Sequence, residues 1–69
     1  MPKEVKYRDV AKFLRGSGWE ILRQRGSHEY WAGPQGRGRL SIVTHGSKVS
    51  PGVVGQIIDQ VPGTPTTWK

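Results

Sequence analysis

The sequence predicts a single α+β domain in which two helices flank three antiparallel strands, in the order α-β-β-β-α. Three observations predict it. Apolar residues recur at three- and four-residue spacing near both ends of the chain, which is typical of amphipathic helices. Three short runs rich in strand-forming residues lie between them, separated by Gly-rich turns. The length of 69 residues allows one domain, with its core expected over residues 6–61.

The first helix is expected in "KYRDVAKFLRGSG", residues 6–18. Tyr7, Val10, Phe13 and Leu14 form one apolar face, and charged residues surround it. Two glycines at the end of this segment supply the left-handed conformations that commonly end a helix. A helix of about ten residues is therefore predicted.

The strands are expected in "WEILRQR" (19–25), "HEYWA" (28–32) and "RLSIVTH" (39–45). If the loop "GPQGRG" closes the second hairpin, Ala32 lies opposite Arg39. Because side chains alternate along a strand, Trp31, Leu40 and Ile42 then share one face, which the helices must cover. The opposite, open face receives His28, Tyr30, Ser41, Val43 and His45.

The second helix is expected in "SPGVVGQIIDQV", residues 50–61, with Ser50 as its N-cap and Pro51 in the first turn. Gly55 inside it costs about 1 kcal/mol relative to Ala, which indicates that another group packs close to the backbone there. Residues 62–69 lack periodicity and are expected to be a flexible tail unless Trp68 docks on the domain. The apolar stripe comprises Val53, Val54, Ile57, Ile58 and Val61.

Both apolar stripes are hidden only if the two helices lie side by side on one face of the sheet. The other face is then left open. This is the layout of a double-stranded-RNA-binding domain.

The composition of the chain limits the classes of function that fit it. Eleven Lys and Arg against five Asp and Glu give a net charge of +6, which favours a polyanionic partner such as nucleic acid; the alternative is that the charge serves solubility. The chain has no cysteine, and its two histidines lack a neighbouring carboxylate cluster, so we expect no metal and no cofactor. No apolar run suits a signal peptide or membrane span, which predicts a cytoplasmic protein without membrane contact.

His28 is the candidate catalytic residue, because it follows the basic segment "RQRGS" on the open face, and histidine exchanges protons near neutral pH. The alternative is an exposed histidine without a role. His45 is a candidate second acid or base. Arginines are expected to surround His28 and attract phosphate. The predicted RNA-binding residues are Arg23, Arg25, Ser27, Tyr30, Arg37, Arg39 and Lys48.

The segments "KFLRGSGWEILRQRGSHEYW", "LSIVTH" and "SPGVVGQII" stand in an order that resembles the HicA toxin family, small bacterial messenger-RNA interferases of toxin–antitoxin systems. The resemblance extends over residues 7–61, and "GSH" with its preceding basic strand is its most specific part. It implies a double-stranded-RNA-binding-like fold, ribonuclease activity without a metal, and a HicB-type antitoxin as partner. The family's catalytic histidine corresponds to His28.

The resulting hypothesis is a messenger-RNA endonuclease that transfers protons through His28. Two alternative hypotheses assign the protein to a different functional class. A non-catalytic module of the same fold would bind double-stranded RNA or DNA without cutting it. A pure protein-interaction domain would show no affinity for nucleic acid even at low salt.

Overall fold

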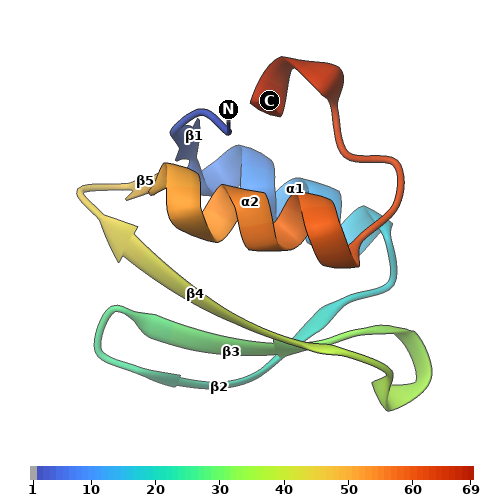
Figure 1. Ribbon diagram of the computed structural model, residues 1–69. Helices are drawn as coiled ribbons and strands as arrows, with labels where there is room; N and C mark the ends of the chain where they lie inside the picture. Colours follow the sequence, from blue (N-terminus) through green and yellow to red (C-terminus); the bar gives the residue numbers. More distant parts are fainter. Residues whose placement is uncertain (1) are drawn as a thin grey trace.

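The computed structural model describes residues 2–69, in which two α-helices accompany a five-stranded antiparallel sheet (Figure 1). In chain order the elements are β1 (Val5–Lys6), α1 (Tyr7–Gly16), β2 (Glu20–Arg25), β3 (His28–Ala32), β4 (Arg39–His45), β5 (Lys48–Val49) and α2 (Pro51–Gln60). Short 3-10 helices occupy Pro34–Gly36 and Thr66–Trp68. The α+β class and both predicted helices are confirmed.

The sheet has the strand order β1-β5-β4-β3-β2. The predicted register of the second hairpin is confirmed, because Ala32 pairs with Arg39 and the pairing continues to His28 with Val43. The prediction of three strands is wrong. β5 pairs with the end of β4 and with β1, and each of these two extra strands has only two residues, too few for a periodic pattern. With this larger sheet, the expected double-stranded-RNA-binding-domain-like fold is not confirmed.

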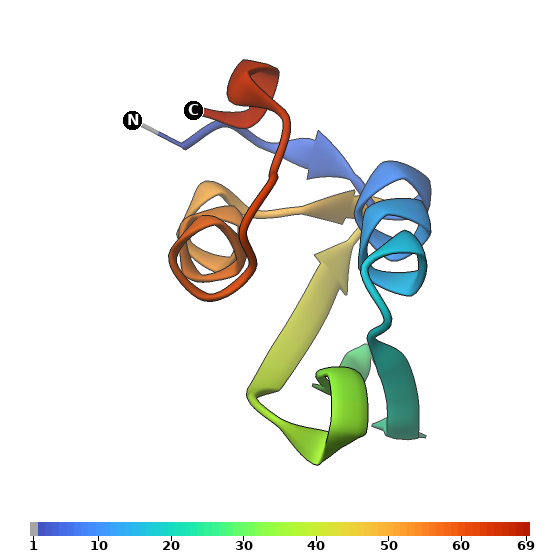
Figure 2. The ribbon, with the colours of Figure 1, turned by 90° about the vertical axis from the view of Figure 1, so that its right-hand side faces the viewer.

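Both helices lie on the same side of the long strands β2, β3 and β4 (Figures 1 and 2). α1 begins where the Tyr7 N–H donates a hydrogen bond to the carbonyl of Ser47, at 2.8 Å, which ties the helix start to the β4–β5 turn. The buried residues of the helices are Val10, Ala11 and Leu14 in α1 and Val54 and Ile57 in α2.

The core lies between the helices and the sheet. Trp31, Leu40 and Ile42 are buried beneath the helices, as the alternation of the strands predicts. The residues predicted for the open face are exposed or half-buried. The other core members are Val5, Val10, Ala11, Leu14, Trp19, Val49, Val54, Ile57, Val61 and Trp68.

The C-terminal segment docks on the domain at Trp68, which is the alternative that the sequence left open to a flexible tail over residues 62–69. Trp68 is 7% exposed and meets the Phe13 ring edge-on, with 5.3 Å between centroids. Its carbonyl accepts a hydrogen bond of 2.8 Å from the Lys3 N–H, so the two chain ends lie side by side. The close neighbour expected at Gly55 is Pro2, whose Cγ would lie 3.2 Å from an added β-carbon.

Candidate functional site

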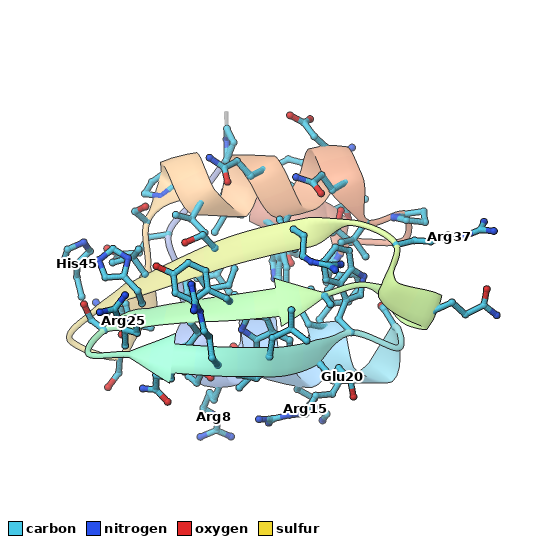
Figure 3. The ribbon with its side chains drawn as sticks, turned by 90° about the horizontal axis from the view of Figure 1, so that it is seen from below. Arg8, Arg15, Glu20, Arg25, Arg37 and His45 are labelled. Carbon is cyan, nitrogen blue, oxygen red and sulfur yellow. The ribbon has the colours of Figure 1, made fainter. Side chains whose placement is uncertain are left out.

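The two histidines lie at the same end of the uncovered face, because His28 pairs with Arg25 and with Val43, and Figure 3 shows Arg25 and His45 at that end. His28 on β3 pairs with Arg25 on β2 and with Val43 on β4. His45 lies two residues beyond Val43 on the same face, which makes it a diagonal neighbour of His28 at about 7–8 Å. Arg25, His28 and His45 are all exposed, and together they form the row that we call the histidine row.

A tight turn holds this row together. β2 and β3 are joined by residues 26–27 alone, and Gly26 has a φ of +60°, which favours glycine at the first central position of a two-residue hairpin loop. The carbonyl of Ser27 accepts a hydrogen bond of 3.3 Å from the Thr44 N–H. The hairpin tip therefore stays beside the end of β4, and His28 stays near His45.

A second row lies next to the first along the strands. Arg23 pairs with Tyr30, and Tyr30 pairs with Ser41. The Arg23 guanidinium carbon lies 4.9 Å from the centroid of the Tyr30 ring, a cation–π contact. The Arg23 guanidinium is therefore exposed on the same face of the sheet as the histidine row.

The structure does not bring Arg37 and Arg39 to His28, contrary to the expectation that they surround it. Arg39 pairs with Ala32, four residues from His28 along β3, which corresponds to about 13 Å. Nη1 of Arg39 donates hydrogen bonds to the carbonyls of Gly36, at 2.7 Å, and Gly38, at 2.9 Å. Arg37 extends from the hairpin at the opposite end of the sheet from His45 and Arg25 (Figure 3).

Lys48 is close to the histidine row, because it pairs with His45 in the β4–β5 hairpin. Its Nζ lies 3.5 Å from Oε1 of Glu4. Both side chains are more than half exposed, and exposed ion pairs of this kind contribute little to stability. The Lys48 ammonium therefore remains available to an anion at this end of the sheet.

A buried carboxylate beneath the site was not predicted. Glu29, between the two open-face residues of β3, is 7% exposed. The Tyr7 hydroxyl lies 2.6 Å from its Oε1 and 2.8 Å from its Oε2, and Trp31 Nε1 donates to Oε1 at 3.1 Å. Burial, together with the hydrogen bond to Glu29 and its negative charge, raises the pKa of Tyr7 to about 12. Strand alternation was the available signal, since it places Glu29 on the same face as Trp31.

The chemistry that this face offers is proton transfer beside positive charge. Two exposed imidazoles lie on one face of the sheet as diagonal neighbours on adjacent strands, and Arg25 beside His28 carries a guanidinium, a group that suits phosphate oxygens. Over residues 2–69 no group of three or more His, Cys, Asp or Glu side chains is arranged to hold a metal ion. Neither helix in this range is long and apolar enough to cross a membrane.

Comparisons with known proteins agree with the resemblance noted in the sequence. No curated protein and no solved structure showed significant similarity to the chain. A sequence model described as the HicA toxin of bacterial toxin–antitoxin systems matches residues 7–61, which include α1, the three long strands, β5 and α2. Because this match covers most of the chain, the protein belongs to the HicA toxin family and is the toxin component of a toxin–antitoxin system, which implies an antitoxin partner.

Proposed function

We propose that the protein is an endoribonuclease that cleaves messenger RNA by proton transfer through His28, without a metal, and that a HicB-type antitoxin inhibits it. The observation that supports this most directly is the histidine row, in which His28 lies between Arg25 and the diagonal neighbour His45 on an uncovered face. Membership of a toxin family provides the second support.

The reaction is a transesterification within the RNA strand. A base removes the proton of the 2′-hydroxyl, the freed oxygen attacks the adjacent phosphorus, and the bond from phosphorus to the 5′-oxygen breaks. An acid returns a proton to that leaving oxygen. The products are a 2′,3′-cyclic phosphate and a 5′-hydroxyl. DNA resists cleavage because it lacks the 2′-hydroxyl.

His28 carries one of the two proton transfers, a role that typically contributes about 10²–10⁴-fold to the rate. His45 supplies the opposite transfer, because it lies on the same face at diagonal distance. Arg25, paired directly with His28, stabilises the negative charge that develops on the phosphoryl oxygens.

The antitoxin provides the acidic surface that covers this face when the toxin is idle. The chain has a net charge of +6, and the described residues of the histidine row include no carboxylate that would neutralise it internally. A complex with antitoxin in which the His28 ring remains fully open to solvent would contradict this part of the proposal.

The test compares purified wild type with His28→Ala on a single-stranded RNA and on the DNA of the same sequence, with EDTA present. His28 is exposed and makes no side-chain hydrogen bond within residues 2–69, so the variant is expected to fold. Wild type should yield cyclic-phosphate ends from the RNA and no cleavage of the DNA. His28→Ala should cleave the RNA more slowly than wild type by about 100-fold or more. Equal rates for the two proteins would refute the role of His28.

A matched pair of arginines tests the charge effect. Arg25→Ala and Arg8→Ala each remove one positive charge, but Arg8 projects from α1, away from the histidine row (Figure 3). Arg25→Ala should slow cleavage at least tenfold more than Arg8→Ala, because only Arg25 lies beside the reacting phosphate. If wild type binds RNA, yields no cleaved ends, and binds as tightly after His28→Ala, the protein is a non-catalytic binding module instead.

A further inference from the structure

A hollow of about 540 Å³ lies next to the histidine row, where residues of the uncovered face meet Gln56 of α2. Its volume lies within the range of about 300–1,000 Å³ that is common for small-molecule sites. It is lined by Leu22 and Arg23 of β2, Tyr30 and the buried Trp31 of β3, Arg39, the buried Leu40 and Ser41 of β4, and Gln56 of α2. Arg39, which does not reach His28, is therefore placed at this hollow.

We propose that this hollow binds the base of the nucleotide next to the cleaved bond, and that Gln56 recognises the edge of that base. The inference rests on the proposed ribonuclease function, and it adds a subsite that determines which RNA sequences are cut.

Leu22 lies at this hollow and is open to solvent. It is 54% exposed, and it is the one large hydrophobic side chain that residues 2–69 leave this open to solvent. A β-bulge puts it there, because Ile21 pairs with Trp31 and Arg23 with Tyr30, so that Leu22 is the additional residue. Bulges near active sites commonly redirect a side chain. Here the bulge places an aliphatic surface beside the hollow, where it contributes little to the core.

Flat side-chain groups line the hollow together with Leu22. The half-buried Tyr30 ring and the Arg23 guanidinium stacked on it, at 4.9 Å, are the two kinds of side chain on which unpaired RNA bases stack. No carboxylate is among the described residues that line the hollow, whereas two arginines are. An uncharged aromatic ring attached to a polyanion therefore fits both its surface and its charge.

Gln56 is the residue of α2 that lines the hollow. β4 pairs with β3 along one edge, and along its other edge β5 pairs only with Thr44 and His45, so no strand of residues 2–69 lies beside the rest of that second edge. Gln56 reaches the hollow from this side. Its side chain is exposed, and its amide takes part in none of the side-chain hydrogen bonds found in residues 2–69. An amide offers one donor and one acceptor group together, which adenine matches with two hydrogen bonds.

The hollow lies close to the histidine row along β3. Tyr30 is two residues from His28 on the same face of β3, which corresponds to about 6.7 Å. A phosphate at His28 therefore leaves the neighbouring base directly beside the hollow. The base subsite and the histidine row can then hold one and the same substrate.

The experiment uses DNA oligonucleotides that contain a single ribonucleotide, so that only one bond is cleavable. The base on each side of that bond is varied in turn, and initial rates are measured for wild type, Gln56→Leu and Gln60→Leu. Gln60 is the matched control, because it is an exposed glutamine one turn further along α2, outside the hollow.

Wild type should prefer adenine at one of the two neighbouring positions by about tenfold or more, the discrimination expected of one amide–base pair. Gln56→Leu should reduce that preference to within about twofold, and Gln60→Leu should retain it. A wild-type rate independent of the neighbouring base, or an adenine preference that persists in Gln56→Leu, would overturn the proposal. The proposal would also be overturned if Gln56→Leu weakened binding to the antitoxin and left every ratio of cleavage rates unchanged. The hollow would then be a contact surface for the antitoxin.

A second measurement separates this proposal from the proposed function. The ¹⁵N-labelled His28→Ala protein, which should bind without cutting, is titrated with a short adenine-containing RNA. The side-chain amide signals of Gln56 should shift, while those of Gln60 remain in place. Unchanged Gln56 signals would overturn the subsite even if wild type cleaves RNA. Shifted signals would retain it even if wild type proves inactive and the ribonuclease proposal fails.

Discussion

The hydroxyl of Tyr7 is predicted to stabilise the fold by about 2 kcal/mol, and Tyr7→Phe isolates this contribution. The substitution keeps the aromatic ring and removes only the group that lies 2.6 and 2.8 Å from the two Glu29 oxygens. A hydroxyl has one hydrogen to donate, so this is a single short bond shared between both oxygens. After its loss, the one side-chain donor to Glu29 left among residues 2–69 is Trp31, at 3.1 Å.

The magnitude follows from the burial and charge of the acceptor. Hydrogen bonds to charged groups contribute about 1.5–3 kcal/mol, and Glu29 is only 7% exposed, so water replaces the lost donor poorly. Tyr7 itself is half-buried, which admits some solvent and places the expected loss near the middle of that range, at about 2 kcal/mol. Domains have about 0.05–0.15 kcal/mol of stability per residue, so this chain has roughly 3–10 kcal/mol in total.

The assay is urea unfolding followed by tryptophan fluorescence, because Trp19, Trp31 and Trp68 are all buried and report on the core. With a slope of about 1 kcal/mol per molar urea, the midpoint should fall by about 2 M. The melting temperature should fall by about 8–16 °C. Tyr30→Phe is the matched control, since its hydroxyl forms no side-chain hydrogen bond within residues 2–69.

This role of the Tyr7 hydroxyl is refuted if the free energies of unfolding of Tyr7→Phe and Tyr30→Phe differ by less than about 0.5 kcal/mol. A difference that small is typical of substitutions at the surface. A double-mutant cycle with Glu29→Gln then locates the cause. If the carboxylate is the partner, Tyr7→Phe should cost about 1 kcal/mol less in the Glu29→Gln background, because residues in contact are not additive.

Further predictions concern pH and packing. The pKa of Tyr7 is raised from 10.0 to about 12, so the folded chain keeps a proton that the unfolded chain loses; the stabilisation is present below pH 10 and is lost as the pH rises from 10 to 12. Urea midpoints at pH 9.5 and 11.5 should therefore differ more for wild type than for Tyr7→Phe, and parallel changes would contradict this assignment. Trp68→Ala should destabilise by about 3 kcal/mol, because a buried indole is lost. Leu22→Ala is the control and should lower the free energy of unfolding by less than about 0.5 kcal/mol in the same urea measurement, since Leu22 is exposed. Equal losses for Trp68→Ala and Leu22→Ala would show that the C-terminal segment is not docked. A β-carbon on Gly33 would meet the Arg37 carbonyl oxygen at 1.8 Å, so Gly33→Ala should destabilise the fold by about 1–3 kcal/mol. Gly16→Ala is the control and should not destabilise the fold, because a β-carbon there would have open space around it. Unchanged stability in Gly33→Ala would contradict the close approach of the Arg37 carbonyl.

The faces of β3 and β4 could be predicted because the loop between them determines their register. Once residues 33–38 close the hairpin, the partner of every residue in β3 follows, and burial of Leu40 and Ile42 excludes a shift by one residue. The same parity placed His28 and His45 on the open face. Local patterns were sufficient here, since pairing partners lie close together in the chain.

The remaining features depend on contacts between distant segments. β1 and β5 are two residues long, and Val5 and Val49 carry no pattern that indicates pairing. The partner of Glu29 is a tyrosine in another element, and a charged residue in a strand ordinarily suggests solvent. The bulge that exposes Leu22 changes the parity of β2 partway along, which a simple alternation does not anticipate.

β3 separates structural and chemical roles by the alternation of its side chains. Glu29 and Trp31 point toward the helices, bond to each other and reach Tyr7 at the start of α1, so they fix the strand from the covered side. His28 lies on the other side, exposed and without a side-chain hydrogen bond among the described residues, so its ring is available to substrate. A domain of this size has little stability to lose, and an exposed side chain such as that of His28 contributes little to the core. The buried anchor therefore lies one residue from His28, the residue that we propose to be catalytic, and a single strand can hold that side chain in place without burying it.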